Sequence, residues 1–95
     1  MRRLIAVITV RREELAVFRD YEALAAQIML RHGGELEHAY VIDDGETLRE
    51  LHVVRFPSDA AFDAYRADPE LAARAPDRAR AVISTEIWPA TEISY

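Results

Sequence analysis

The sequence predicts an α+β fold, and three observations support this. Residues 55–70 read as the end of a strand that runs directly into a short amphipathic helix. Residues 4–10 form a continuous apolar run rich in β-branched side chains, which is typical of a central strand buried on both faces. Asp44–Gly45 separates two segments of strand character, and this dipeptide is a strong hairpin signal.

The first half of the chain predicts a strand at residues 4–10 and a helix from residue 13 to about residue 31. Glutamates at the start of this helix and Arg31 at its end suit the helix dipole. The dipeptide Gly33–Gly34 follows His32 and ends the helix, because glycine adopts the left-handed conformation without strain. One side of the helix is traced by Leu15, Phe18, Tyr21 or Glu22, Ala25, Ile28 and Met29.

The second half predicts strands at residues 35–43 and 47–56, joined by the Asp44–Gly45 turn. Pro57 and Ser58 form a corner, and a helix follows from residue 58 to about 67, with a further turn or two over 69–75. Pro76 interrupts, residues 80–88 form the last strand, and the tail 89–95 regains strand character at 91–95. The order β-α-β-β-α-β is that of the ferredoxin-like fold, with a four-stranded antiparallel sheet.

Composition limits the classes of function. The 95 residues make one domain, 1–95, and the absence of cysteine excludes disulfides and thiol nucleophiles. A formal net charge of −5 argues against a nucleic-acid or anionic-membrane partner, because phosphate binding needs a basic face. No segment has the apolar length of a transmembrane helix, so we expect a cytoplasmic protein. The three histidines lack metal-ligand spacing, and we expect neither a metal nor another cofactor.

Two helices can cover only one side of a four-stranded sheet. The other side should still be substantially apolar, and a second subunit is its natural cover. We therefore expect a homodimer, in which the tail 89–95 contacts the partner subunit.

A set of residues spread over most of the chain carries a family resemblance: Phe56-Pro57-Ser58, Ala61, Tyr65, Asp68-Pro69-Glu70 and His32-Gly33-Gly34. Through these residues the chain resembles the dimeric α+β barrel superfamily. It is most similar to an uncharacterised branch of small bacterial barrels, a domain of unknown function related to antibiotic-biosynthesis-type monooxygenases, stress-responsive barrel proteins and muconolactone isomerases. The central hairpin departs from that branch, because it is tight and lacks a glycine-rich loop.

A two-residue turn at Asp44–Gly45 would place Glu37 directly opposite His52 and near Glu50, on one face of the sheet. The resemblance implies that the aromatic residue that closes the third strand, Phe56, and the polar residue four positions earlier, His52, point into a cavity. The opposite face, with Leu36, Leu51 and Val53, should then pack on the helices.

This register suggests a catalytic site. His52 would be a general base, Glu37 would orient it, and Glu50 would serve as a second acid or base. Phe56 and Val54 would form the substrate wall, and Trp88 would line the cavity mouth or pack at the dimer seam. The alternative for Glu37 is a charge that protects an edge strand, and His32 is better explained as part of the helix end.

The resulting hypothesis is a cofactor-independent oxygenase, cyclase or isomerase. It would act by proton transfer on a small apolar or aromatic metabolite. The alternative is a non-catalytic dimer that binds a small ligand or serves as an interaction module.

Overall fold

The computed structural model describes residues 1–95 and contains four strands, four α-helices and one 3₁₀ turn. The strands are β1 (Arg2–Val10), β2 (Glu35–Asp43), β3 (Leu48–Phe56) and β4 (Val82–Ala90). The helical elements are η1 (Arg12–Glu14), α1 (Leu15–Arg31), α2 (Asp59–Arg66), α3 (Pro69–Ala73) and α4 (Ala75–Ala81).

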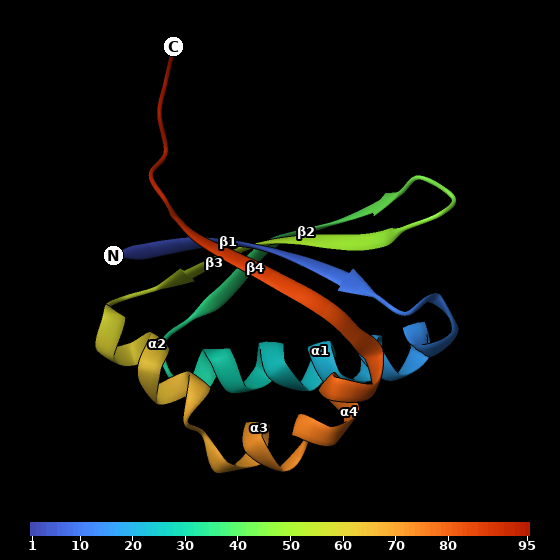
Figure 1. Cartoon of the computed structure of the whole chain (residues 1–95). Coiled ribbons are helices and arrows are strands. Elements are labelled where there is room, and N and C mark those ends of the chain that lie inside the picture. Colours follow the sequence, from blue (N-terminus) through green and yellow to red (C-terminus); the bar gives the residue numbers. More distant parts are fainter.

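The four strands form one antiparallel sheet in the order β2-β3-β1-β4. All the helices lie against the same face of this sheet, and the opposite face carries none (Figure 1). This is the predicted ferredoxin-like α+β fold, with the apolar first strand in a central position. No helix is long and apolar enough to cross a membrane.

Helix α1 packs along the sheet through the side that the sequence predicts. Phe18, Ala25 and Ile28 are buried there. At its C-terminal end the backbone N–H of Gly34 donates to the carbonyl of Met29 at 2.8 Å, and Gly33 adopts a φ of 77°. The helix therefore ends at the two glycines as predicted, because the left-handed residue reverses the chain toward β2.

The corner between β3 and α2 is also as predicted. The Ser58 hydroxyl accepts a hydrogen bond from the backbone N–H of Ala61 at 3.1 Å, which caps α2. Phe56 is fully buried, with its ring centroid 5.3 Å from that of Tyr65. A Cβ on Gly34 would lie 2.3 Å from the Phe56 ring, so only glycine lets the two chain segments approach this closely.

The C-terminal region differs from the prediction. Pro76 lies in the first turn of α4, where a missing N–H costs no hydrogen bond, so it helps to begin a helix instead of interrupting one. The last strand consequently runs from Val82 to Ala90, not over residues 80–88. Residues 91–95 form no strand and extend away from the sheet (Figure 1).

The predicted two-residue hairpin is wrong, and the loop between β2 and β3 has four residues. The Asp44 carboxylate accepts hydrogen bonds from the backbone N–H groups of Glu46 at 3.0 Å and Thr47 at 2.7 Å, which closes the longer loop. Asp43 therefore pairs with Leu48, two residues out of the predicted register. A shift of two preserves the face of each side chain.

A bulge at Glu37 then overturns the predicted pairing of Glu37 with His52. The register shifts between Leu36 and His38, so His52 lies opposite Ala39. Glu37 instead meets Arg3, whose Nε donates to Oε1 at 2.9 Å. The bulge reverses the faces of the residues that precede it, and Glu37 lies on the opposite side of the sheet from His52.

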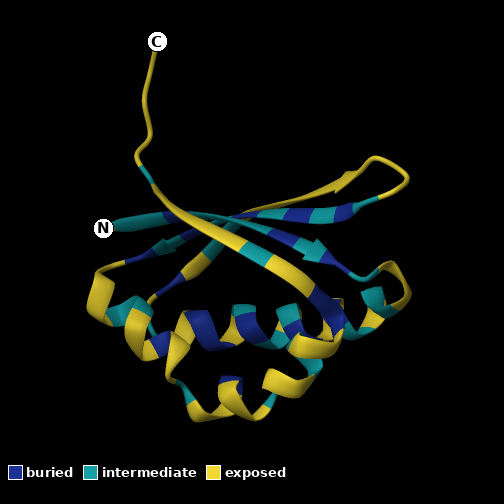
Figure 2. Ribbon diagram, in the orientation of Figure 1, coloured by how far each residue is buried: buried dark blue, intermediate teal, exposed yellow.

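The helices pack on the sheet face that contains His52, Val54 and Phe56, so the expectation that they cover Leu51 and Val53 is wrong. We call this helix-covered side the inner face, and the side that carries Leu51 and Val53 the outer face. Burial alternates along β3 accordingly, with every second residue buried (Figure 2). The inner face is the better covered because its residues contact the apolar side of α1.

Candidate functional site

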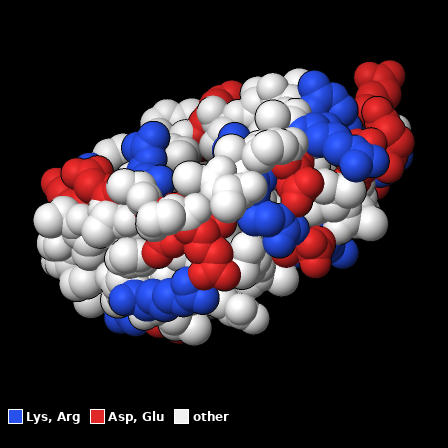
Figure 3. All heavy atoms as spheres, turned by 90° about the horizontal axis from the view of Figure 1, so that it is seen from below, with Lys and Arg blue, Asp and Glu red and all other residues white.

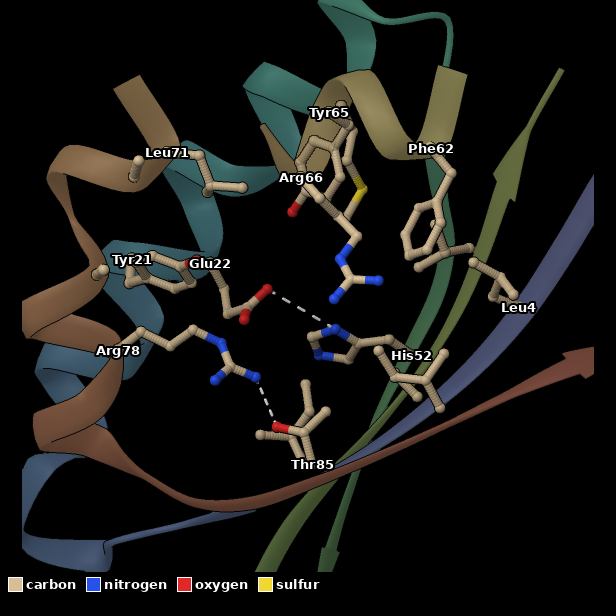
Figure 4. A pocket seen from close by; sticks show the side chains of 17 residues that line it. Leu4, Tyr21, Glu22, His52, Phe62, Tyr65, Arg66, Leu71, Arg78 and Thr85 are labelled. Atoms are coloured by element: carbon tan, nitrogen blue, oxygen red, sulfur yellow. Dashed lines mark hydrogen bonds and ion pairs between the residues drawn. The ribbon is translucent and has the colours of Figure 1, made fainter. Parts of the chain in front are cut away.

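A cavity of about 640 Å³ lies between the inner face of the sheet and the helices. Its size falls within the range typical of sites for small organic ligands. The strands β1, β3 and β4 form its floor, and α1 to α4 form its walls (Figure 4). The residues that line it are Leu4, Ala6, Ile8, Tyr21, Glu22, Met29, His52, Val54, Phe62, Tyr65, Arg66, Leu71, Ala72, Ala75, Arg78, Thr85 and Ile87.

His52 on β3 is the buried polar residue of the cavity floor, with 3% of its surface exposed. Its Nε2 lies 2.9 Å from Oε1 of Glu50, which is on the same face two residues earlier. Arg19 of α1 in turn donates from Nε to Oε2 of Glu50 at 3.3 Å. Because an ionised carboxylate can only accept, this chain of contacts places the imidazole hydrogen on Nε2.

The second ring nitrogen of His52 faces Glu22 of α1. Nδ1 lies 3.8 Å from Oε2 of Glu22, and the two side chains point toward each other across the cavity (Figure 4). His52 is thus held between two carboxylates. Glu50, on the same strand, fixes the tautomer of the ring through Nε2. Glu22, on α1, faces Nδ1 inside the cavity.

Burial shifts the pKa of two residues that line this cavity, Glu22 and Tyr65. It raises the pKa of Glu22 above the usual value, although His52 and Arg78 act in the opposite direction. Burial also raises the pKa of the phenol of Tyr65, and Glu22 adds to that effect. A carboxyl group that gains a proton more readily than usual is better suited than an ordinary carboxyl group to exchange protons with a ligand.

The structure separates the predicted site residues into three groups. His52 and Val54 line the cavity, and Glu50 bonds to His52 from beside it. Phe56 lies in the hydrophobic core with no exposed surface, so it does not form a cavity wall. Glu37 and Trp88 lie on the outer face; Trp88 pairs with Ile5 and is 49% exposed, so its placement at the cavity mouth is wrong.

Three charged cavity residues were not predicted: Glu22, Arg66 and Arg78. Glu22 falls at a position of the apolar side of α1, where a charged residue is unusual, and this was the available signal. The arginines carried no such signal. Their side chains reach the cavity because of how the short helices α2 and α4 are oriented, and that orientation depends on the tertiary fold.

The remaining histidines lie elsewhere. Nε2 of His32 is 2.8 Å from Oδ2 of Asp68, and this contact ties the end of α1 to the start of α3. The interaction lowers the pKa of Asp68. No group of three or more histidine, aspartate or glutamate side chains is placed to hold a metal ion.

Comparison with solved structures places this architecture among known folds. A NIPSNAP domain protein from Burkholderia xenovorans is 14% identical with a TM-score of 0.76, and the match covers 100% of this chain and 97% of that one. SnoaB, a cofactor-independent oxygenase from Streptomyces nogalater, is 16% identical with a TM-score of 0.67, covering 99% and 94%. An antibiotic biosynthesis monooxygenase is 12% identical with a TM-score of 0.73, covering 99% and 100%.

The protein therefore has the ferredoxin-like α+β fold of these proteins, and the predicted relationship is confirmed at the level of the fold. No family model and no curated protein matches the sequence.

Proposed function

We propose that the protein catalyses cofactor-independent proton transfer on a small, largely apolar or aromatic metabolite. The observation that carries this proposal is the placement of His52 between Glu50 and Glu22 on the floor of a cavity whose lining is mostly apolar. Such a proton abstraction can begin an oxygenation, a cyclisation or an isomerisation. The likeness to a cofactor-independent oxygenase supports this class of reaction.

In this mechanism Nδ1 of His52 accepts a proton from an acidic C–H or O–H group of the ligand. The electron pair stays on the ligand as an enolate or phenolate. Glu50, bonded to Nε2, stabilises the resulting imidazolium and holds the ring in place. Glu22 is the second acid or base, because it lies in the same cavity and burial favours its protonated form.

Hydrogen exchange in D₂O tests the proposal without knowledge of the natural product. A small panel of enolisable aryl ketones and aryl 1,3-diketones is incubated with the protein, and deuterium incorporation at the acidic carbon is followed by NMR. We expect exchange above the buffer rate with the wild type. His52→Gln should lower the enzymatic rate by about 100-fold or more, as expected for loss of a general base.

Glu37→Gln is the matched control, because Glu37 is a glutamate of the same sheet that faces away from the cavity. It should retain the wild-type exchange rate. Retention of the full rate by His52→Gln would remove His52 from the mechanism. Binding of the ketones without any exchange would favour the non-catalytic ligand-binding module.

We further propose that the protein is a homodimer in which a second copy covers the outer face. This face is apolar in the middle of the central strands, where Ile5, Val7, Leu51 and Val53 are only half-buried in the single chain. Trp88 extends the apolar surface onto β4. A sheet with helices on one side needs a cover for its other side. The tail 91–95 extends on the side of the sheet away from the helices, where a partner subunit would lie (Figure 1).

A further inference from the structure

The arginines of this chain divide into those that bind a carboxylate or backbone carbonyls of the protein and those that bind neither. The chain has twelve basic residues, all arginine. Nine form an ion pair with a carboxylate within 4.0 Å, namely Arg2, Arg3, Arg12, Arg19, Arg31, Arg49, Arg55, Arg74 and Arg80. Arg11 donates to three backbone carbonyls. Only Arg66 and Arg78 have neither arrangement, and both line the cavity.

A shortage of carboxylates does not explain this. The chain has 17 acidic residues against 12 basic ones, and acidic and basic side chains lie side by side on the helical face of the molecule (Figure 3). Arg66 and Arg78 both lie in the last turn of a helix, where the helix dipole favours a positive charge. The dipole accounts for their place on the helix. It does not account for guanidinium groups that turn into a common cavity.

Each of the two side chains is held in place by a contact that leaves donors unused. Nη2 of Arg78 donates to the hydroxyl of Thr85 on β4 at 2.6 Å. The guanidinium of Arg66 lies over the ring of Phe62, 5.4 Å from its centroid. Arg66 enters the cavity from α2 and Arg78 from α4, and both side chains point into the space that Glu22 and His52 also line (Figure 4). The planar guanidinium is the side chain best suited to bind a carboxylate through two hydrogen bonds.

We propose that the cavity selects ligands that carry a carboxylate on a small aromatic or alicyclic body, and that Arg66 and Arg78 bind this carboxylate. The body of the ligand then lies against the apolar floor formed by Leu4, Val54 and Ile87. This inference names the substrate class of the site, and its catalytic meaning rests on the proposed proton transfer. Anchoring the acid group at the arginines would place the rest of the ligand beside His52.

A pair of nearly isosteric probes tests the proposal. Binding of 2-naphthoate and of its neutral carboxamide is measured at pH 7 by ligand-observed NMR and isothermal titration calorimetry. The wild type should prefer the carboxylate by about 10-fold or more, as expected for charge-assisted hydrogen bonds. Arg66→Gln and Arg78→Gln should each weaken carboxylate binding by a similar factor and leave carboxamide binding unchanged.

Arg80→Gln is the control, since Arg80 is a basic residue of the same helix as Arg78 but pairs with Glu14 outside the cavity. It should bind both probes like the wild type. Arg78→Lys keeps the charge without the planar pair of donors, and it should retain only part of the preference. This variant also guards against a Gln variant that fails to fold.

Two results would overturn the proposal: equal binding of the carboxylate and the carboxamide by the wild type, or carboxylate binding that survives both Gln substitutions. Failure of the proton-transfer function has a different signature. In that case the carboxylate preference depends on the two arginines, but no compound exchanges hydrogen. Conversely, exchange of the ketones by a wild type that binds the carboxylate and the carboxamide equally well would leave proton transfer intact and remove the anion selectivity.

Discussion

The two faces of the sheet are built from the same strands but differ in how they are covered: helices bury the inner face and leave the outer face uncovered. On the inner face, Val54 and Phe56 are buried beneath α1 and α2, and the polar residues His52 and Glu50 are bonded to each other. On the outer face, Leu51 and Val53 stay half-buried. The inner face thus holds both the core and the cavity, whereas the outer face offers apolar surface without internal cover.

The difference teaches that burial and polarity are not aligned in this protein. The better buried face carries the buried ionisable residues, His52 and Glu50. The middle of the less buried face is aliphatic, and its ionisable residues, such as Arg3 and Glu37, pair with each other at the surface. Buried ionisable groups are costly unless they are paired, and here they gather around a cavity. Function is therefore expected on the inner face, and association on the outer face.

The largest effect should come from the inner face at Phe56. Phe56→Ala removes a fully buried ring that contacts Phe62 and Tyr65, and it should lower the free energy of unfolding by about 3–5 kcal/mol. Tyr40→Ala on the outer face removes a ring that is 57% exposed. Urea denaturation at two protein concentrations separates the faces. The loss of unfolding free energy caused by Phe56→Ala should not change with protein concentration. The loss caused by Tyr40→Ala should rise with concentration if a second copy covers the outer face.

A smaller effect on stability, but a clear one on mass, should follow from a charge on the outer face. Val53→Glu places a carboxylate at the centre of the proposed interface, and we expect the mass by light scattering to fall to that of one chain, 10.8 kDa. Circular dichroism should be unchanged. The emission of Trp88, the single tryptophan, should shift to longer wavelength as its surroundings become aqueous.

Ala64→Glu is the matched control, because Ala64 is exposed on α2 in the helical layer. It should leave the mass and the emission as in the wild type. A wild-type protein that is already monomeric at high concentration would refute the dimer directly.

The order of the elements could be predicted because their signals are local. Ser58 caps the helix that follows it, and Gly33–Gly34 ends the helix before it, whatever the rest of the chain does. The identity of the inner face could not be predicted in the same way. Both faces of β3 carry apolar residues and two ionisable ones, so the strand alone does not tell which side the helices cover.

The candidate site was predicted only as far as single strands allowed. His52 and Glu50 are two residues apart on one strand, so their contact needs no tertiary information. The pairing with Glu37 depended on a register that the Asp44 loop and the bulge at Glu37 both alter. Glu22 comes from a different element, and its distance to His52 is set by the packing of α1 on the sheet.

The smallest expected effects are pH-dependent changes in melting temperature, and they compare the two faces through one glutamate on each, Glu22 and Glu37. Burial raises the pKa of Glu22 above its ordinary value of 4.5, so ionisation of Glu22 opposes folding. This loss of stability begins as the pH rises through 4.5 and is complete above the raised folded pKa. Glu22→Gln should therefore melt at a higher temperature than the wild type at pH 7 to 8, and the difference should vanish near pH 4.

Glu37→Gln should show the opposite sign. The hydrogen bond from Arg3 lowers the pKa of Glu37, so its ionised form favours folding, and that contribution is lost as the pH falls through the lowered folded pKa. The variant should melt slightly below the wild type at neutral pH and match it in acid. The shift should be smaller than for Glu22, because solvent screens an ion pair at the sheet surface. Melting curves at constant protein concentration from pH 3 to pH 8 decide the matter: two differences of the same sign would mean that the faces do not differ electrostatically as the structure requires.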